Sequence, residues 1–185
     1  MKHIIYLLIW TCLIQLLPFH AYAIGPAEAL QILQQAKNWS DASDQIVIAI
    51  ECVQSNKVES AIPCLVPHID FAPMGDEVDI TMGTIAKVHP VTYCLITLGK
   101  PAADGIIDYL NTTDAIITDK QLAQYAVALV SLLRRVPAIE LLNEKRNSHT
   151  DARLQNNFDR LIQVITPAEQ SVPGYPPQGV GSPEP

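Results

Sequence analysis

Carboxylates and histidines gather in one part of the chain, and this combination can bind a divalent cation. The group consists of His68, Asp70, Asp76, Glu77, Asp79 and, further on, His89. Oxygen and imidazole ligands suit calcium, zinc and related ions. The spacing, however, matches neither an EF-hand loop nor a zinc signature. We therefore favour helix capping and a solvated acidic surface, and we expect neither a metal nor a cofactor.

Two cysteines lie close to histidines, which is the pairing that a thiol nucleophile needs. Cys64 precedes His68 by four residues, so a helix would place both on one side, and Cys94 follows His89 by five. Catalysis would also need an oxyanion site and a group that orients the base, and the sequence indicates neither. Pro67 makes a helix between the first pair irregular. We interpret these cysteines as core residues and predict no catalytic residue.

The same cysteines raise the question of a disulfide. Cys52 and Cys64 flank the turn around Lys57 at similar distances, so neighbouring antiparallel helices could bring their thiols together. In an oxidising compartment they would then pair. The hypothesis is a Cys52–Cys64 bridge, with Cys94 as the unpaired cysteine. The alternative is that all three cysteines are buried as small apolar residues and form no bridge.

A helical elbow between Leu98 and Leu110 is the clearest element that could position such residues. Gly99 follows an apolar run and can adopt the left-handed conformation that ends a helix. Pro101 cannot continue that helix but suits the first turn of another. Beyond it, apolar residues recur at steps of three and four. We expect two helices that pack antiparallel as a hairpin.

Similar turns occur at residues 61–66 and 135–140. Aligning Pro63, Asp104 and Pro137 gives spacings of 41 and 33 residues, near the period of two-helix repeats. The Gly-Lys-Pro-Ala and Ala-Ile-Pro turns resemble those of HEAT and HEAT-like (phycobilisome-lyase type) repeats over residues 44–146. The resemblance implies a short α-solenoid of stacked antiparallel helix pairs. The chain departs from it at Gly105, and glycine inside a helix costs about 1 kcal/mol relative to alanine.

Periodicity and breakers predict an all-α chain. The expected helices, besides the two at the elbow, cover residues 26–37, 43–55, 57–69, 76–89, 119–135, 137–144 and 151–165. Thr118 or Asp119 is expected to cap the helix that follows, and Thr150 or Asp151 the last one. His89 before Pro90 predicts a break. Residues 24–166 would form one helical repeat domain.

Both ends of the chain predict segments outside that domain. Residues 1–23 resemble a secretory signal peptide, with Lys2, an apolar run over 4–17 and an Ala-Tyr-Ala cleavage pattern. The alternative is an uncleaved anchor, but the run is shorter than the roughly 20 residues that a spanning helix needs. Residues 167–185 are rich in proline and glycine, which predicts a disordered tail. The alternative for the tail is a polyproline segment that binds an aromatic groove.

The net charge of the chain limits the classes of partner that it can bind. Removing Lys2 with the signal changes the formal net charge from −7 to −8, which argues against nucleic acid as a partner. We expect a periplasmic or secreted, non-enzymatic adaptor or scaffold that binds a protein of unknown identity and does not bind the membrane after cleavage. The expected partner face lies on the second helix of each repeat and consists of Asp104, Asp108, Glu140, Glu144 and Lys145. The alternative is an enzyme or accessory factor with a Cys/His or carboxylate site on the same scaffold.

Overall fold

The protein is all-α, as predicted. The computed structural model describes residues 24–40, 43–73 and 85–166, and these contain helices and no strand. The predicted signal peptide, the predicted tail and the carboxylates Asp76, Glu77 and Asp79 lie outside the described residues. No helix within the described ranges combines the length and the apolar character needed to cross a bilayer.

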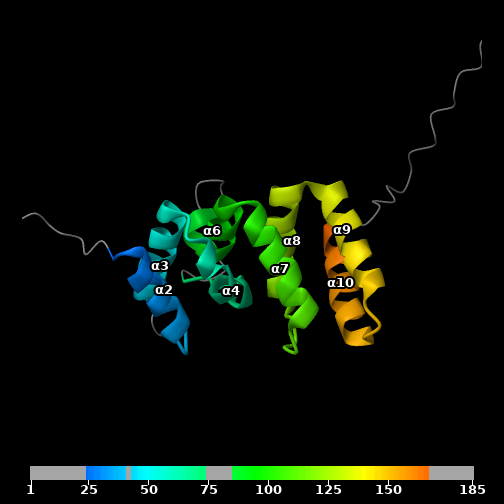
Figure 1. The fold of residues 1–185 in the computed structure, drawn as a ribbon, viewed down its shortest axis with the longest axis horizontal. Coiled ribbons are helices and arrows are strands. Elements are labelled where there is room, and N and C mark those ends of the chain that lie inside the picture. Colours follow the sequence, from blue (N-terminus) through cyan, green and yellow to red (C-terminus); the bar gives the residue numbers. More distant parts are fainter. Residues whose placement is uncertain (1–23, 41–42, 74–84, 167–185) are drawn as a thin grey trace, which may run out of the picture.

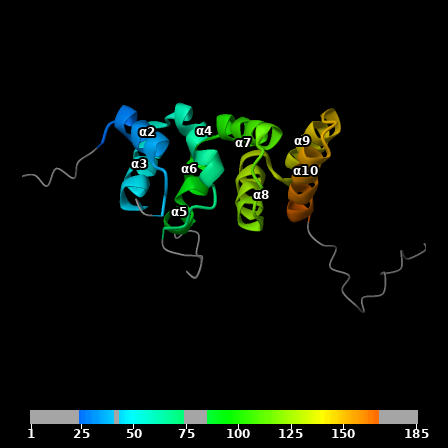
Figure 2. The same ribbon diagram turned by 90° about the horizontal axis from the view of Figure 1, so that it is seen from below.

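The helices form two rows along the long axis of the molecule, which Figure 2 shows one above the other. The first row contains α2 (Pro26–Gln35), α4 (Ile62–Leu65), α7 (Lys100–Thr112) and α9 (Arg135–Ser148). The second row contains α3 (Ser43–Asn56), the short α5 (Ile85–Val88) with α6 (Pro90–Leu98), α8 (Asp119–Leu133) and α10 (Ala152–Ile165). Within the second row, α3 packs on α6, α6 on α8, and α8 on α10. One apolar core extends from Ala29 to Ile165 between the rows.

The elbow at Gly99 forms as predicted, but the helices that it joins do not form a hairpin. Gly99 has φ +80°, a conformation that side chains disfavour, and Pro101 lies in the first turn of α7. The expectation of antiparallel packing is wrong, because Figure 2 shows α7 running across the direction of α6. A single residue between two helices leaves no length for a reversal, so the chain turns a corner.

The predicted helix over 57–69 is broken into three short pieces. They are the 3₁₀ turn η1 (Glu59–Ala61), α4, and the 3₁₀ turn η2 (Val66–His68). Pro63 and Pro67 cause the breaks, because neither has an N–H to donate and each ring crowds the preceding turn. The carbonyl groups at the end of such a segment need donors from elsewhere.

Side chains of the second row supply those donors. Tyr125 on α8 donates its hydroxyl hydrogen to the carbonyl of Val66 over 3.0 Å, and Gln121 donates to Pro67 over 3.0 Å. The buried Thr92 on α6 donates to the carbonyl of Ile69 over 3.1 Å. The irregular segment is thus held in place by α6 and α8.

Three prolines of the first row lie at similar positions in their helices. Pro63, Pro101 and Pro137 each lie in the first turn of their helix, in α4, α7 and α9. They are 38 and 36 residues apart. The predicted alignment with Asp104 in the middle position is therefore three residues off, because Asp104 lies in the second turn of α7.

Gly105 marks a close approach of α7 to α4. A β-carbon built at this position would collide with Cγ2 of Ile62. Glycine in mid-helix costs stability locally, and here its lack of a side chain allows two first-row helices to pack. This contact gives a physical reason for a glycine at position 105.

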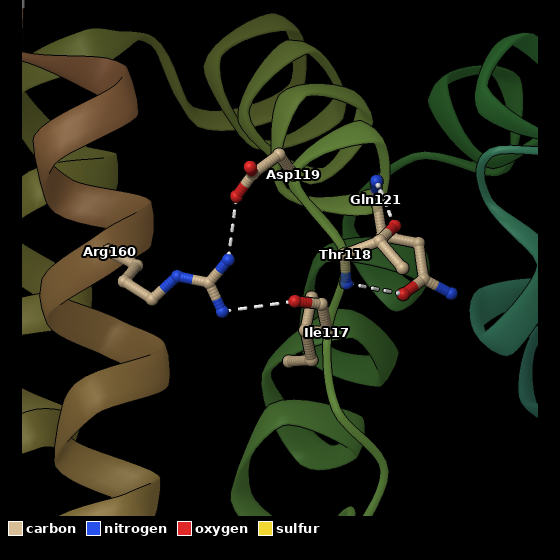
Figure 3. Close-up of polar contacts among 5 residues, drawn as sticks. All are labelled: Ile117, Thr118, Asp119, Gln121 and Arg160. Atoms are coloured by element: carbon tan, nitrogen blue, oxygen red, sulfur yellow. Dashed lines mark hydrogen bonds and ion pairs between the residues drawn. The ribbon is translucent and has the colours of Figure 1, made fainter.

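The start of α8 is fixed by a cap and by α10 (Figure 3). Thr118 accepts a hydrogen bond from the backbone N–H of Gln121, whose side chain accepts one from the N–H of Thr118, so the two form a capping box. Arg160 on α10 donates to the carbonyl of Ile117 over 3.0 Å and to Asp119 over 2.7 Å. These contacts join α10 to the start of α8.

Candidate functional site

The predicted partner face lies on two helices of the first row. Asp104 and Asp108 are one helical turn apart and exposed on α7, and Glu140 and Glu144 are likewise exposed on α9. The opposite sides of both helices are buried in the core, through Ala102, Ala103, Ile106, Ile107 and Leu110 on α7 and through Ala138 and Leu142 on α9. The structure therefore places all four carboxylates on solvent-facing sides.

A side-chain hydrogen bond holds the two helices in register. Asn111 near the end of α7 lies 2.8 Å from the ring nitrogen Nε2 of His149, the residue that follows α9. In Figure 1, α7 and α9 both run from the top of the view to the bottom, and α10 packs against both of them. Because this bond joins the C-terminal ends of α7 and α9, the carboxylate pair on each helix lies at a similar distance from it along the helix.

The face is acidic. Lys145 Nζ lies 3.4 Å from Glu144, and both side chains are substantially exposed, so this ion pair contributes little energy. Within the described ranges, Asp104, Asp108 and Glu140 have no cation at ion-pair distance. The carboxylates thus remain available to a positively charged partner.

The second row presents a different surface, which the sequence analysis did not anticipate. Each of its four long helices exposes one large apolar side chain, namely Ile48 on α3, Tyr93 on α6, Val127 on α8 and Val164 on α10. Tyr93 and Val127 each lie between two buried residues, so periodicity gave no reason to single them out. The second row thus exposes scattered apolar groups, and the first row exposes Val136 on α9 as well as its carboxylates.

The structure holds Cys52 and Cys64 as free thiols, so it does not show the expected bridge between them. The thiol of Cys52 donates to the carbonyl of Ile24 over 3.2 Å. Burial raises the pKa of Cys64, and a hydrogen bond with Gln34 opposes this in part. The two thiols thus have separate partners in the segment that contains α2.

The two predicted Cys–His pairs do not assemble a nucleophile. Cys94 is fully buried, lies 3.9 Å from the carbonyl of Ile50 on α3, and burial raises its pKa to about 12. A thiol with that pKa stays protonated near neutral pH and is a poor nucleophile. The hydrogen bond found for the Cys64 thiol is with Gln34, and the ring of His68 stacks on Trp39.

That stacking belongs to an aromatic cluster beside a cavity. The rings of Trp39 and His68 are nearly parallel, with centroids 4.1 Å apart, and Phe71 meets Trp39 edge-on at 5.4 Å. Burial lowers the pKa of His68, although nearby Asp70 acts in the opposite direction. The imidazole of His68 is consequently neutral at pH 7.

The cavity has a volume of about 570 Å³, within the range of small-molecule sites. Its walls come from three separate segments: the chain after α2, the chain around η2, and the start of α8. The lining residues are Lys37, Asn38, Trp39, Ser40, Ser43, His68, Asp70, Phe71, Ala72, Pro73 and Lys120. Sequence reasoning identified His68 and Asp70 as metal candidates but missed the cavity, because no local pattern brings residues 39, 71 and 120 together.

The metal hypothesis gains no support from the described residues. No three His, Cys, Asp or Glu side chains within residues 24–40, 43–73 and 85–166 are placed to hold an ion. Of the predicted ligands, His68 and Asp70 line the cavity and His89 immediately precedes α6.

Comparisons of the chain with protein-family models, with curated proteins and with solved structures gave no match. The resemblance to HEAT-like repeats therefore remains a prediction from the sequence.

Proposed function

We propose that this chain is an exported helical-repeat protein that binds another protein, without catalysis, through the acidic face of α7 and α9. The observation that supports this proposal most is the pair of carboxylates on each helix, all four exposed and on one row. Stacked helices commonly present one row as a binding surface. The charge predicts a partner with a basic surface, which would associate faster at low ionic strength.

The HEAT-like architecture is part of the same proposal. It is supported by two rows of helices and by first-turn prolines 38 and 36 residues apart in the first row. The spacing is close to the period of two-helix repeats. The corner at Gly99 supports a repeat boundary between α6 and α7, which would pair α7 with α8.

A second candidate function is that of an accessory factor that handles a small molecule. The cavity with Lys37, His68, Asp70 and Lys120 favours it, because several titratable groups line one concavity. A thiol mechanism is disfavoured, since the buried Cys94 is protonated at neutral pH.

A charge-reversal capture experiment tests the binding proposal. The purified chain is cross-linked in extract from its native compartment, beside a variant with Asp104, Asp108, Glu140 and Glu144 all changed to Lys. A matched control reverses four exposed acids elsewhere, Glu28, Asp44, Glu51 and Glu59. We expect one stoichiometric partner that the control retains and the α7/α9 variant loses. A partner retained equally by both variants, or no partner above background, contradicts the proposed face.

Export is tested separately. We propose that cleavage after Ala23 releases a periplasmic or secreted chain beginning at Ile24, on the basis of the signal-like sequence. The mass of the protein recovered from its native compartment is expected to match residues 24–185. A mass that includes residues 1–23 would contradict cleavage and favour the anchor.

A further inference from the structure

Two opposite charges beside Trp39, on Lys37 and Asp70, are not paired with any described residue. Both residues line the same cavity. Asp70 is half-buried and Lys37 is exposed. A cation and an anion that line one cavity without pairing with each other complement a ligand that carries both charges.

We propose that this cavity binds a small zwitterion of the α-amino acid class. The carboxylate of the ligand would meet the ammonium group of Lys37, and its ammonium group would meet the carboxylate of Asp70. Lys120 adds a second ammonium group to the wall, and Asn38, Ser40 and Ser43 add hydrogen-bonding groups. Charge-assisted hydrogen bonds of this kind are stronger than neutral ones.

The remaining walls fit the same class of ligand. Phe71, Ala72 and Pro73 provide apolar surface for a side chain. The ring of His68 is held by stacking on Trp39, so it is a fixed wall and not a mobile group. Because the imidazole of His68 is neutral, the recognition of the two ligand charges depends on Lys37 and Asp70.

This inference is independent of the binding face on α7 and α9, because none of the lining residues belongs to those helices. The volume of about 570 Å³ exceeds what a single amino acid fills, so water or a longer side chain would share the space. Since Lys37 is exposed, we expect weak binding, in the micromolar to millimolar range.

Binding can be tested with the purified chain and each of the twenty common L-amino acids at ~10 mM, by ligand-observed NMR. For every amino acid that binds, the N-acetyl derivative removes the positive charge and the amide derivative removes the negative charge. We expect at least one amino acid to bind and both of its derivatives to bind at least tenfold more weakly. If no amino acid binds, or if either derivative binds as well as its parent, the proposal is overturned.

Two variants locate the site. Asp70→Asn and Lys37→Gln are expected to weaken binding at least tenfold, whereas Glu51→Gln on α3 should leave it unchanged. Circular dichroism and thermal unfolding confirm that each variant is folded. Unchanged affinity in both folded cavity variants would place any amino acid site elsewhere and overturn the assignment.

Discussion

Tyr125 donates its phenolic hydrogen to the backbone carbonyl of Val66, 3.0 Å away, and so joins α8 to the broken segment between α3 and α5. Both residues are buried, and burial raises the pKa of the Tyr125 phenol. Replacing Tyr125→Phe would keep the ring and leave the Val66 carbonyl without this donor. We expect a loss of about 1–3 kcal/mol in the free energy of unfolding, measured by urea denaturation.

Tyr109→Phe is the matched control. Tyr109 lies near Tyr125, with ring centroids 6.3 Å apart, but it is only half-buried. Removing the hydroxyl group of Tyr109 is expected to change the free energy of unfolding by less than about 0.5 kcal/mol. Equal losses in the two variants would show that the Val66 contact contributes nothing specific.

Gly105→Ala should destabilise the protein although alanine favours helices. The gain in helix propensity is about 1 kcal/mol, but the new β-carbon would collide with Ile62 on α4. Crowding of this kind costs about 1–3 kcal/mol, so we expect no net gain and most often a net loss. The double variant Gly105→Ala with Ile62→Leu, which has no methyl branch at Cβ and so lacks Cγ2, tests whether the collision involves that atom.

Ser131→Ala is the control for propensity alone, because Ser131 is exposed on α8. It should raise stability by a few tenths of a kcal/mol. If Gly105→Ala were stabilising by a full 1 kcal/mol, the close approach of α4 and α7 would be refuted.

Arg160 and Asp119 should contribute unequally to the junction of α8 and α10. The Asp119 side chain is 96% exposed, so solvent screens its ion pair with Arg160. The hydrogen bond that Arg160 donates to the backbone carbonyl of Ile117 is half-buried, so solvent screens it less. We expect Arg160→Ala to cost about 1–2 kcal/mol and Asp119→Asn less than about 1 kcal/mol in thermal unfolding. A larger effect of Asp119→Asn would reverse this ranking.

Cys94 makes stability depend on alkaline pH. Its pKa is raised by burial from 9.0 to about 12, so the folded state holds a proton that the unfolded state releases in this window. The contribution is therefore complete below pH 9 and is lost as the pH rises towards 12, by up to about 1.4 kcal/mol per pH unit. Urea unfolding between pH 7 and 10.5 should show a shallower decline for Cys94→Ala than for the unaltered chain. Parallel curves would contradict a buried, protonated thiol.

The number of free thiols can be counted directly. The structure holds Cys52, Cys64 and Cys94 free, so iodoacetamide in denaturant without reductant should add three groups to a chain beginning at residue 24. One added group would show that a bridge forms after export, as the cysteine spacing suggested. In the folded protein Cys94 should remain unlabelled, because it is fully buried.

Local chemistry explains which elements were predictable. The end of α6 at Gly99, the break at His89, and the caps Thr118 and Asp151 follow from the backbone preferences of single residues and their near neighbours. The segment around Pro63 was harder, because its broken form depends on donors such as Tyr125, which lies 59 residues from Val66 in sequence.

Long-range packing explains what could not be predicted. The role of Gly105 becomes visible only when Ile62 is placed against it. The crossing of α6 and α7 depends on how the rows pack, and the cavity needs Trp39, His68 and Lys120 from three segments. The helical pattern was enough to predict that the carboxylates of the partner face are exposed. Their use by a partner remains a proposal.

The central claim is that a protein partner contacts the acidic face, and site-specific photo-cross-linking tests it most directly. A photoreactive phenylalanine analogue would replace Asp108 on α7 in one variant and Val127, exposed on the second row, in another. After irradiation in the native compartment, we predict a discrete cross-linked product from position 108 and none from position 127. A product from position 127 alone would place the partner on the second row and contradict the account.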